Sequence, residues 1–355
     1  MPRSDPMQFP HRRKNILTGE WVLVSPQRTR RPWNGEVSPP SRDRLNAYEP
    51  ECYLCPGNKR SNGERNPSYK RPFVFTNDYA ALLPGTVPWK SGGHDLLIAE
   101  TERGVCRVVC FSPRHDLTVA AMSEREIEDV VTAWQDEFRS LAADPRINSV
   151  QIFENKGAMM GCSNPHPHGQ LWAQESIPME PMKEGKQFKK HFRRNGRSLL
   201  GDYATLELRL QERLVYENRS FVIVVPFWAV WPFETLMISK RAMPDILELR
   251  RIEKKDFANA LSVMAIKYDN LFDTFFPYSA GLHQAPTDGN GHEEWHLHMH
   301  WYPPLLRSAD LKKFMVGYEM LAEPQRDSTP EASAKILRDL PVVHYRDRRK
   351  TSSRA

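Results

Sequence analysis

Residues 163–170 read S-N-P-H-P-H-G-Q, a polar stretch punctuated by two prolines. Side chains at alternate positions of an extended backbone point to the same side. The residues on one such face are His166, His168, Gln170 and Trp172. Pro165 and Pro167 fall on the opposite face. Because proline supplies no N–H to a neighbouring strand, they favour a strand end or edge that carries a rigid exposed loop. Because two imidazoles and an amide are costly to bury without a purpose, this stretch is predicted to carry chemistry rather than to be an ordinary surface loop.

A helix and a strand are predicted immediately before this stretch. Ser123 and Glu126 form the S-x-x-E pattern of a helix N-terminus, and the apolar residues that follow recur at helical spacing. Residues 148–154 then read as a core strand, which leads through a Gly-Met loop into the histidine motif.

The second half of the chain repeats this plan at low sequence similarity. Residues 221–230 and 235–239 read as strands, and an amphipathic helix with apolar residues from Phe257 to Phe272 follows. The stretch W-H-L-H-M-H-W at 295–301 again alternates histidines on a strand. We therefore predict an α+β fold built from two copies of one unit, each with an antiparallel sheet and one helical layer.

The composition is that of an ordinary soluble protein, with 355 residues, 40% of them hydrophobic and 26% charged. This length suffices for two domains or one large one. The first ten residues lack the apolar run of a signal peptide, and no stretch is long enough to span a membrane, so a cytoplasmic protein is expected. The net charge of +6 suits anionic partners but does not separate a nucleic acid from a sugar nucleotide.

Five cysteines without an export signal indicate reduced thiols or metal ligands rather than disulfides. Cys52 and Cys55 form a C-x-x-C pair, which suits zinc, but a complete site needs two more ligands and no second C-x-x-C exists. A zinc site and two incidental thiols both remain open, and a redox pair is the less favoured third interpretation. Cys106 and Cys110 lie in an apolar run and are interpreted as small buried side chains.

His296, His298 and His300 alternate along the second histidine strand. Three imidazoles on one strand face favour a transition metal, and the alternative is a histidine ladder on an exposed face. No role can be assigned to His292 or His296 from the sequence.

The motif at 163–170 resembles that of the histidine-triad superfamily of nucleotide transferases and hydrolases, with Gln170 in the place of the third histidine. That exchange marks the transferase branch, and the chain is similar to the galactose-1-phosphate uridylyltransferase family. The similarity covers nearly the full length and returns in H-R-R-K-N-I-L-T-G-E-W-V-L-V-S-P, F-T-N-D-Y-A-A-L, W-P-F-E-T-L, Y-P-P-L-L-R-S and K-F-M-V-G-Y-E-M-L-A-E-P-Q-R-D. The resemblance implies two histidine-triad-like halves, residues 1–185 and 186–355, whose strands join into one large sheet with helices packed on it.

The resemblance also implies two metal sites. The positions that match the family's other two zinc ligands are His115 and His166, so the resemblance implies a zinc site formed by Cys52, Cys55, His115 and His166. His166 then holds the metal two residues from His168, so the zinc braces the reactive loop. A second structural site, for iron or zinc, carries over to Glu184, His283, His298 and His300.

The activity implied by the resemblance is exchange of UMP between UDP-glucose and galactose 1-phosphate, a step of Leloir galactose metabolism. His168 is the expected nucleophile, because covalent catalysis divides one hard displacement into two easier ones. Gln170 is expected to donate a hydrogen bond to a phosphoryl oxygen. The expected nucleotide and phosphate contacts are Arg28, Arg31, Asn77, Asp78, Asn155, Ser163 and Gln170. Positions that recognise the sugar nucleotide across a homodimer interface match Lys313, Phe314, Tyr318, Glu319 and Gln325.

Two other functions remain as alternatives. A histidine-triad nucleotide hydrolase or phosphorylase would use water or inorganic phosphate as acceptor, and Gln170 counts against it. A basic zinc-containing RNA-binding protein would account for the net charge and the C-x-x-C pair. The chain lacks RNP-like aromatic sequences and interleaved basic repeats, so neither a nucleic-acid partner nor a membrane partner is expected.

Overall fold

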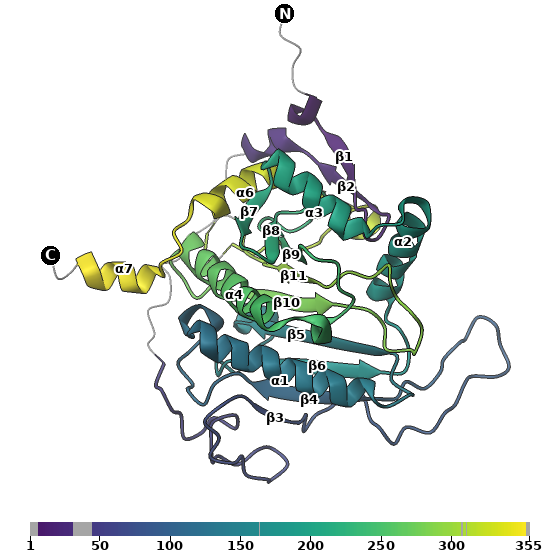
Figure 1. The fold of residues 1–355 in the computed structure, drawn as a ribbon, viewed down its shortest axis with the longest axis vertical. Helices are drawn as coiled ribbons and strands as arrows, with labels where there is room; N and C mark the ends of the chain where they lie inside the picture. The colour runs from purple at the N-terminus through teal and green to yellow at the C-terminus, as the bar shows by residue number, and fades with distance from the viewer. Residues whose placement is uncertain (1–5, 31–44, 163, 307, 310, 353–355) are drawn as a thin grey trace, which may run out of the picture.

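The computed structural model describes residues 6–30, 45–162, 164–306, 308–309 and 311–352. A nine-stranded antiparallel sheet runs through the centre of the molecule (Figure 1). Its strands, in spatial order, are β3 (Phe73–Thr76), β4 (Gly104–Cys110), β6 (His168–Gln174), β5 (Ser149–Lys156), β10 (Tyr278–His283), β11 (His298–Tyr302), β9 (Thr235–Ser239), β8 (Phe221–Val224) and β7 (Leu214–Glu217).

The two halves of the chain meet at the pairing of β5 with β10, in which Gly281 lies opposite Phe153. On either side of that pair the order is mirrored, since β6 and β4 follow β5 while β11 and β9 follow β10. Each half also contributes one long helix, α1 (Glu124–Ala142) and α4 (Arg251–Leu271), and the two helices lie side by side on the same face of the sheet (Figure 1). The predicted α+β fold, with duplicated units joined into one sheet, is confirmed.

Alternating burial shows that the sheet is covered on both faces. Phe221 and Ile223 of β8 pack in the core beneath α1 and α4, whereas Val222 and Val224 pack in a second core. That second core is closed by α2 (Met179–Asn195) and α3 (Leu199–Leu210). This is the side-chain alternation expected of strands buried on both faces.

The helix predicted to begin at Ser123 is confirmed with its N-terminal capping. The Ser123 hydroxyl accepts a hydrogen bond from the Glu126 N–H, and the Glu126 carboxylate accepts the Ser123 N–H at 2.8 Å. Of the described helices, none is long and apolar enough to cross a bilayer. The expected division at 185/186 falls within α2 and stays a prediction.

A small second sheet sits beside the large one and joins the two ends of the chain. It consists of β1 (His11–Lys14), β2 (Trp21–Val24) and β12 (Gln325–Arg326), with β12 parallel to β2. Val22 of β2 packs in the second core with Leu214 and Val224, so this sheet lies near β7 and β8 (Figure 1). The remaining helices are α5 (Tyr318–Leu321), α6 (Pro330–Asp339) and α7 (Tyr345–Ser352), with 3-10 turns at Pro6–Gln8, Pro26–Arg30, Val119–Ala121, Ala158–Met160 and Ile246–Glu248.

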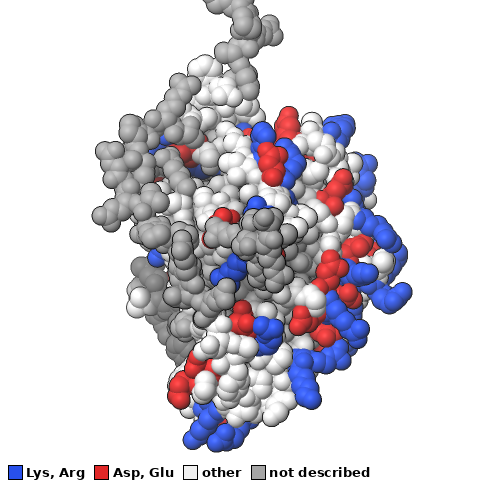
Figure 2. All heavy atoms as spheres, turned by 90° about the vertical axis from the view of Figure 1, so that its left-hand side faces the viewer, with Lys and Arg blue, Asp and Glu red and all other residues white. Residues whose placement is uncertain are grey.

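Charge is mixed on the surface drawn in Figure 2, where acidic and basic side chains alternate along the right-hand edge.

Candidate active site

β6 begins at His168 and continues the histidine motif as a regular strand. Burial alternates along it, with Gly169, Leu171 and Ala173 buried and the intervening side chains half-buried. Gly169 is required by close packing, because a Cβ there would come within 2.8 Å of the Phe111 ring and 2.9 Å of the Phe153 carbonyl oxygen. The tight packing of this face leaves the opposite face of β6 for polar side chains.

The ring of His168 is held in one orientation and one tautomer. Its Nδ1–H donates to the His166 carbonyl oxygen at 2.8 Å, which leaves the lone pair on Nε2. Burial lowers the pKa of His168, so the imidazole is neutral near pH 7. A neutral, oriented imidazole with a free nitrogen is what a nucleophilic role requires.

Gln170 lies on the same face of β6, and its amide is oriented by the next residue on that face. The Trp172 indole N–H donates to Gln170 Oε1 at 3.0 Å, so the amide NH₂ remains available as a donor. Trp172 is itself held by an edge contact with Phe153, with ring centroids 5.6 Å apart.

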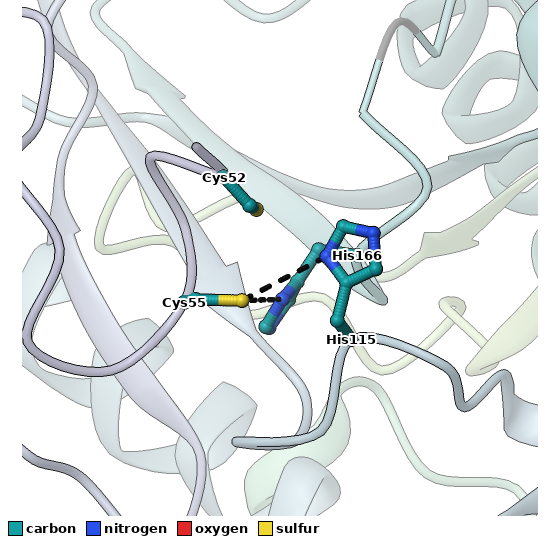
Figure 3. A group of neighbouring side chains, drawn as sticks. All are labelled: Cys52, Cys55, His115 and His166. Atoms are coloured by element: carbon teal, nitrogen blue, oxygen red, sulfur yellow. Dashed lines mark hydrogen bonds between the residues drawn. The ribbon is translucent and has the colours of Figure 1, made fainter. Parts of the chain in front are cut away.

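Four buried side chains from three loops converge beside this strand (Figure 3). Cys55 Sγ lies 3.5 Å from His166 Nδ1 and 3.7 Å from His115 Nδ1, and the ligand atoms of the group, Cys52 included, are within 4.8 Å of one another. His166 Nε2 donates to the Ser112 carbonyl oxygen at 2.8 Å, which turns Nδ1 toward the thiols. Burial raises the pKa of the Cys55 thiol to about 11, so a thiolate there needs a cation, and two sulfurs with two imidazole nitrogens suit a tetrahedral metal.

A second group of potential metal ligands lies in the second half of the chain, beside β10 and β11. Glu184 of α2 places its Oε2 2.8 Å from His283 Nδ1 and 3.3 Å from His298 Nε2, while its Oε1 is 3.5 Å from His300 Nε2. The buried Nε2 atoms of His298 and His300 have no hydrogen-bond partner among the described residues, which fits a metal between the rings. Burial opposes ionisation of Glu184, but the imidazoles facing it hold its pKa well below the ordinary value.

The two histidine strands share one hydrogen-bond pattern. His298 Nδ1–H donates to the His296 carbonyl oxygen at 2.7 Å, as His168 does to His166, and His296 Nε2–H donates to the Ser239 carbonyl oxygen at 2.6 Å. His296 therefore braces its strand as His166 braces the first, a role that the sequence did not reveal. In the second half the equivalent of the free His168 nitrogen faces the Glu184 carboxylate.

The expected substrate-contacting residues fall into two groups. Asn77, Asp78 and Asn155 belong to the first half with His168, and Asn155 Oδ1 accepts a hydrogen bond from the Ser279 hydroxyl at 2.7 Å. Arg31 and Ser163 lie outside the described residues.

The second group surrounds the small sheet. Gln325 lies on β12, its carbonyl accepts a hydrogen bond from Lys313 Nζ at 3.0 Å, and Lys313 pairs with Glu319. Phe314 and Tyr318 are 64% and 52% exposed.

These groups lie far apart within one chain. Five strand spacings separate β6 from β8, where the small sheet packs, which amounts to roughly 24 Å at the usual spacing between strands. Figure 1 shows β1 and β2 at one end of the molecule and β3, β4 and β6 at the other. A single chain therefore does not bring Arg28 and Gln325 to His168.

Comparison with known proteins decides the family. The N-terminal domain model of galactose-1-phosphate uridyl transferase matches residues 2–178, and the C-terminal domain model matches residues 184–349. The chain belongs to the galactose-1-phosphate uridylyltransferase family.

Members of this family are similar to the chain over almost its whole length. The galactose-1-phosphate uridylyltransferase of Haemophilus influenzae is 49% identical over 346 residues, which cover 98% of this chain and 99% of that protein. The Saccharomyces cerevisiae protein of the same name is 48% identical, with 95% and 96% covered. A solved structure of a uridylyltransferase is 27% identical, covers 92% of this chain and 97% of its own, and superposes with a TM-score of 0.72.

Several residues that shape this family member's site carry no local sequence signal. Ser112 and Ser239 accept the hydrogen bonds of His166 and His296 through their backbone carbonyls, and Asp327 contacts Arg28 from almost 300 positions away. The sequence predicted the polar face around His168 because alternating side chains are a local pattern, whereas these contacts depend on the tertiary fold.

Proposed function

We propose that the chain exchanges a uridylyl group between UDP-glucose and galactose 1-phosphate through a covalent intermediate on His168. The observation that carries this proposal is the Nδ1–H of His168 bonded to the His166 carbonyl, which leaves Nε2 as the nucleophile. The family membership supplies the substrate class.

In the first step His168 Nε2 attacks the α-phosphorus of UDP-glucose. A P–N bond forms, the bond from phosphorus to the bridging oxygen breaks, and glucose 1-phosphate leaves with the electron pair. The Nδ1 proton stays on the ring and remains bonded to the His166 carbonyl, which stabilises the positive charge that develops on the imidazole. In the second step a phosphate oxygen of galactose 1-phosphate attacks the same phosphorus, the P–N bond breaks, and UDP-galactose leaves.

Gln170 donates its free amide hydrogens to a non-bridging phosphoryl oxygen. Charge on that oxygen grows toward the transition state, so a fixed donor favours the transition state over the bound substrate. A sugar phosphate is a good leaving group and needs no acid, which is consistent with a neutral amide in the third position. A nucleotide phosphorylase or hydrolase is the alternative, and it differs in the acceptor.

The two buried ligand groups would hold metals that stabilise the fold and take no part in the reaction. Zinc fits the Cys52, Cys55, His115 and His166 set, and when bound it neutralises the thiolates and fixes the loop whose carbonyl orients His168. Iron or zinc fits the group formed by Glu184 with its three histidines.

A homodimer completes the site. The separation between His168 and the group around Arg28, Lys313 and Gln325 supports an arrangement in which each subunit lends the second group to its partner. Exposed Phe314 and Tyr318 suit a surface covered by another copy. The free cysteines suit a reducing compartment such as the cytoplasm.

Isotope exchange tests the double displacement. The protein is incubated with UDP-glucose and labelled glucose 1-phosphate, without galactose 1-phosphate. We expect label to appear in UDP-glucose, because the first step reverses without the second substrate. A phosphorylase with the same intermediate would also show this exchange, so the acceptor is tested separately: we expect galactose 1-phosphate to yield UDP-galactose. UDP formed only with inorganic phosphate, or UMP formed with water, in place of UDP-galactose would contradict the proposal.

A further inference from the structure

The small sheet holds β12 against β2 by backbone hydrogen bonds. The Leu23 N–H donates to the Pro324 carbonyl oxygen at 2.9 Å, and the Ser25 N–H donates to that of Arg326 at 2.9 Å. The turn Pro26–Arg30 starts directly after Ser25, so Arg28 lies next to the end of β12.

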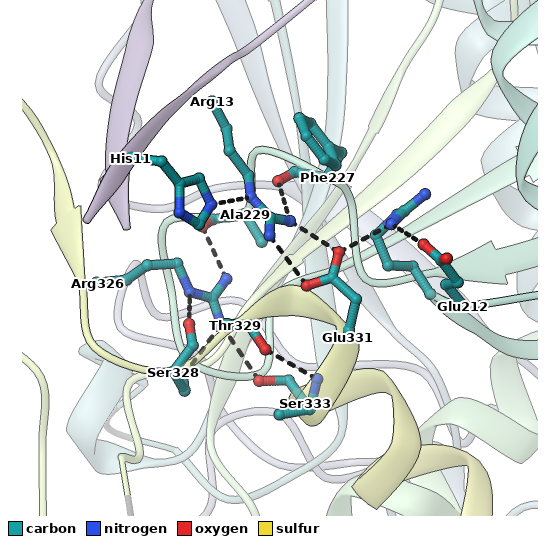
Figure 4. Close-up of polar contacts among 12 residues, drawn as sticks. His11, Arg13, Glu212, Phe227, Ala229, Arg326, Ser328, Thr329, Glu331 and Ser333 are labelled. Carbon is teal, nitrogen blue, oxygen red and sulfur yellow. Dashed lines mark hydrogen bonds and ion pairs between the residues drawn. The ribbon is translucent and has the colours of Figure 1, made fainter. Parts of the chain in front are cut away.

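Arg326 fixes β12 from the buried side. Its side chain is 3% exposed and has no carboxylate partner among the described residues. The guanidinium donates instead to the Ala229 carbonyl oxygen at 2.7 Å and to the Ser333 hydroxyl at 3.2 Å (Figure 4). It also donates to the Pro232 carbonyl oxygen at 3.2 Å. A buried cation is costly without such bonds, so these contacts restrict β12 to one position.

The opposite edge of the small sheet is held by an ion-pair network. Glu331 of α6 forms a two-pronged pair with Arg13 of β1, with distances of 2.8 and 3.1 Å (Figure 4). Glu331 also pairs with Arg213 at 2.8 Å. β1 and β12 are therefore both anchored to the start of α6, and we call this anchored small sheet the platform.

Asp327 lies on this platform immediately after Arg326. Its Oδ1 accepts hydrogen bonds from Arg28 Nε at 2.9 Å and from Gln325 Nε2 at 2.8 Å. Among the described residues, Asp327 is the only side chain bonded to the Arg28 guanidinium, and it engages Nε rather than the two terminal nitrogens that would face a diphosphate. One carboxylate oxygen thus sets the orientation of two of the expected sugar-nucleotide contacts.

We propose that Asp327 is a positioning residue for uridylyl transfer: it holds Arg28 and Gln325 as one preassembled pair of donors for the sugar nucleotide bound at His168 of the partner subunit. The inference rests on the proposed function. Asp327 does not touch the reacting atoms, and it acts by sparing the substrate the cost of ordering two mobile side chains.

Substitution of Asp327 separates binding from chemistry. In Asp327→Ala we expect the KM for UDP-glucose to rise roughly tenfold to a hundredfold while kcat changes little, because misplaced binding groups weaken substrate and transition state alike. Asp327→Asn keeps an oxygen where Oδ1 stands and should restore most of the affinity. Asp136→Ala, which removes an exposed aspartate–arginine pair of 2.9 Å on α1, should leave KM unchanged.

A double-mutant cycle with Arg28→Ala shows whether Asp327 acts through Arg28. If the two residues are coupled, the fold-increase in KM of the double variant should be well below the product of the fold-increases of the two single variants. Fully multiplicative effects, or an Asp327→Ala protein that is less stable but has wild-type KM, would overturn the inference. Isotope exchange by the wild-type protein is measured in parallel and tests the proposed function separately.

Discussion

At the residue scale, the proposed transfer depends on the surroundings of His168 and Gln170 on β6. A neutral imidazole, oriented by one carbonyl, stands two residues from an amide whose oxygen is already engaged. We expect Gln170→Ala to lower the single-turnover rate by about 10²- to 10³-fold, since it removes one donor to a developing charge. Trp172→Phe should cost less, because the amide keeps its donors and loses only its orientation. A Gln170→Ala protein with wild-type turnover would remove this role of the amide.

Glu331 provides a residue-scale test of the network under the small sheet. Burial opposes its ionisation, but the bonds from Arg13 and Arg213 lower the pKa of Glu331 from 4.5 to about 2. Its stabilising contribution is therefore complete above about pH 4.5 and is lost as the pH falls toward 2. Because the Glu331 side chain is 31% exposed, solvent screening reduces the contribution, and we expect Glu331→Gln to lower the free energy of unfolding by roughly 2 kcal/mol at pH 7.

Urea unfolding at pH 7 and pH 3 measures this effect. The difference between Glu331→Gln and the wild type should shrink at pH 3, and an equal loss at both pH values would show that packing rather than charge is responsible. Asp339→Asn, which removes an exposed pair with Lys335 on the same helix, is the matched control and should change stability little at either pH.

The proposed metal ligands belong to the scale of elements, because Cys52, His115 and His166 come from three separate loops. We expect Cys52→Ala to lose about one metal ion per chain and to lower both stability and activity, since the loop that orients His168 loses its brace. Metal content by mass spectrometry and thermal unfolding check this. Cys106→Ala replaces another buried thiol outside both ligand groups and should retain the metal.

Hydrophobic periodicity predicted the elements of the fold but not their order in space. The helix at Ser123 and the histidine strands follow from local patterns, and the duplicated plan was visible in their repetition. The joining of the halves through β5 and β10, and the addition of β12 to a sheet begun 300 residues earlier, depend on long-range pairing that no local pattern encodes. For the same reason His166, His168 and Gln170 could be singled out from spacing, whereas the contacts of Asp327 and Arg326 could not.

At the scale of the whole molecule, the active site is expected to span two chains. Mixing two inactive variants tests this. His168→Ala and Arg28→Ala subunits, exchanged in equal amounts, should form hybrid dimers with one intact site each and recover about a quarter of wild-type activity. Activity no greater than the sum of the separate variants, despite verified hybrid formation, would mean that Arg28 acts on the His168 of its own chain.

The covalent intermediate is the most direct measure of how the whole enzyme works. The protein is incubated with UDP-glucose labelled in the uracil, without acceptor, and quenched in alkali, where a phosphoramidate survives. We predict about one label per intact site, matched by released glucose 1-phosphate, absent in His168→Ala and discharged as UDP-galactose by galactose 1-phosphate. Absence of labelling in metal-replete protein, or undiminished labelling of His168→Ala, would contradict the assignment of His168 as nucleophile.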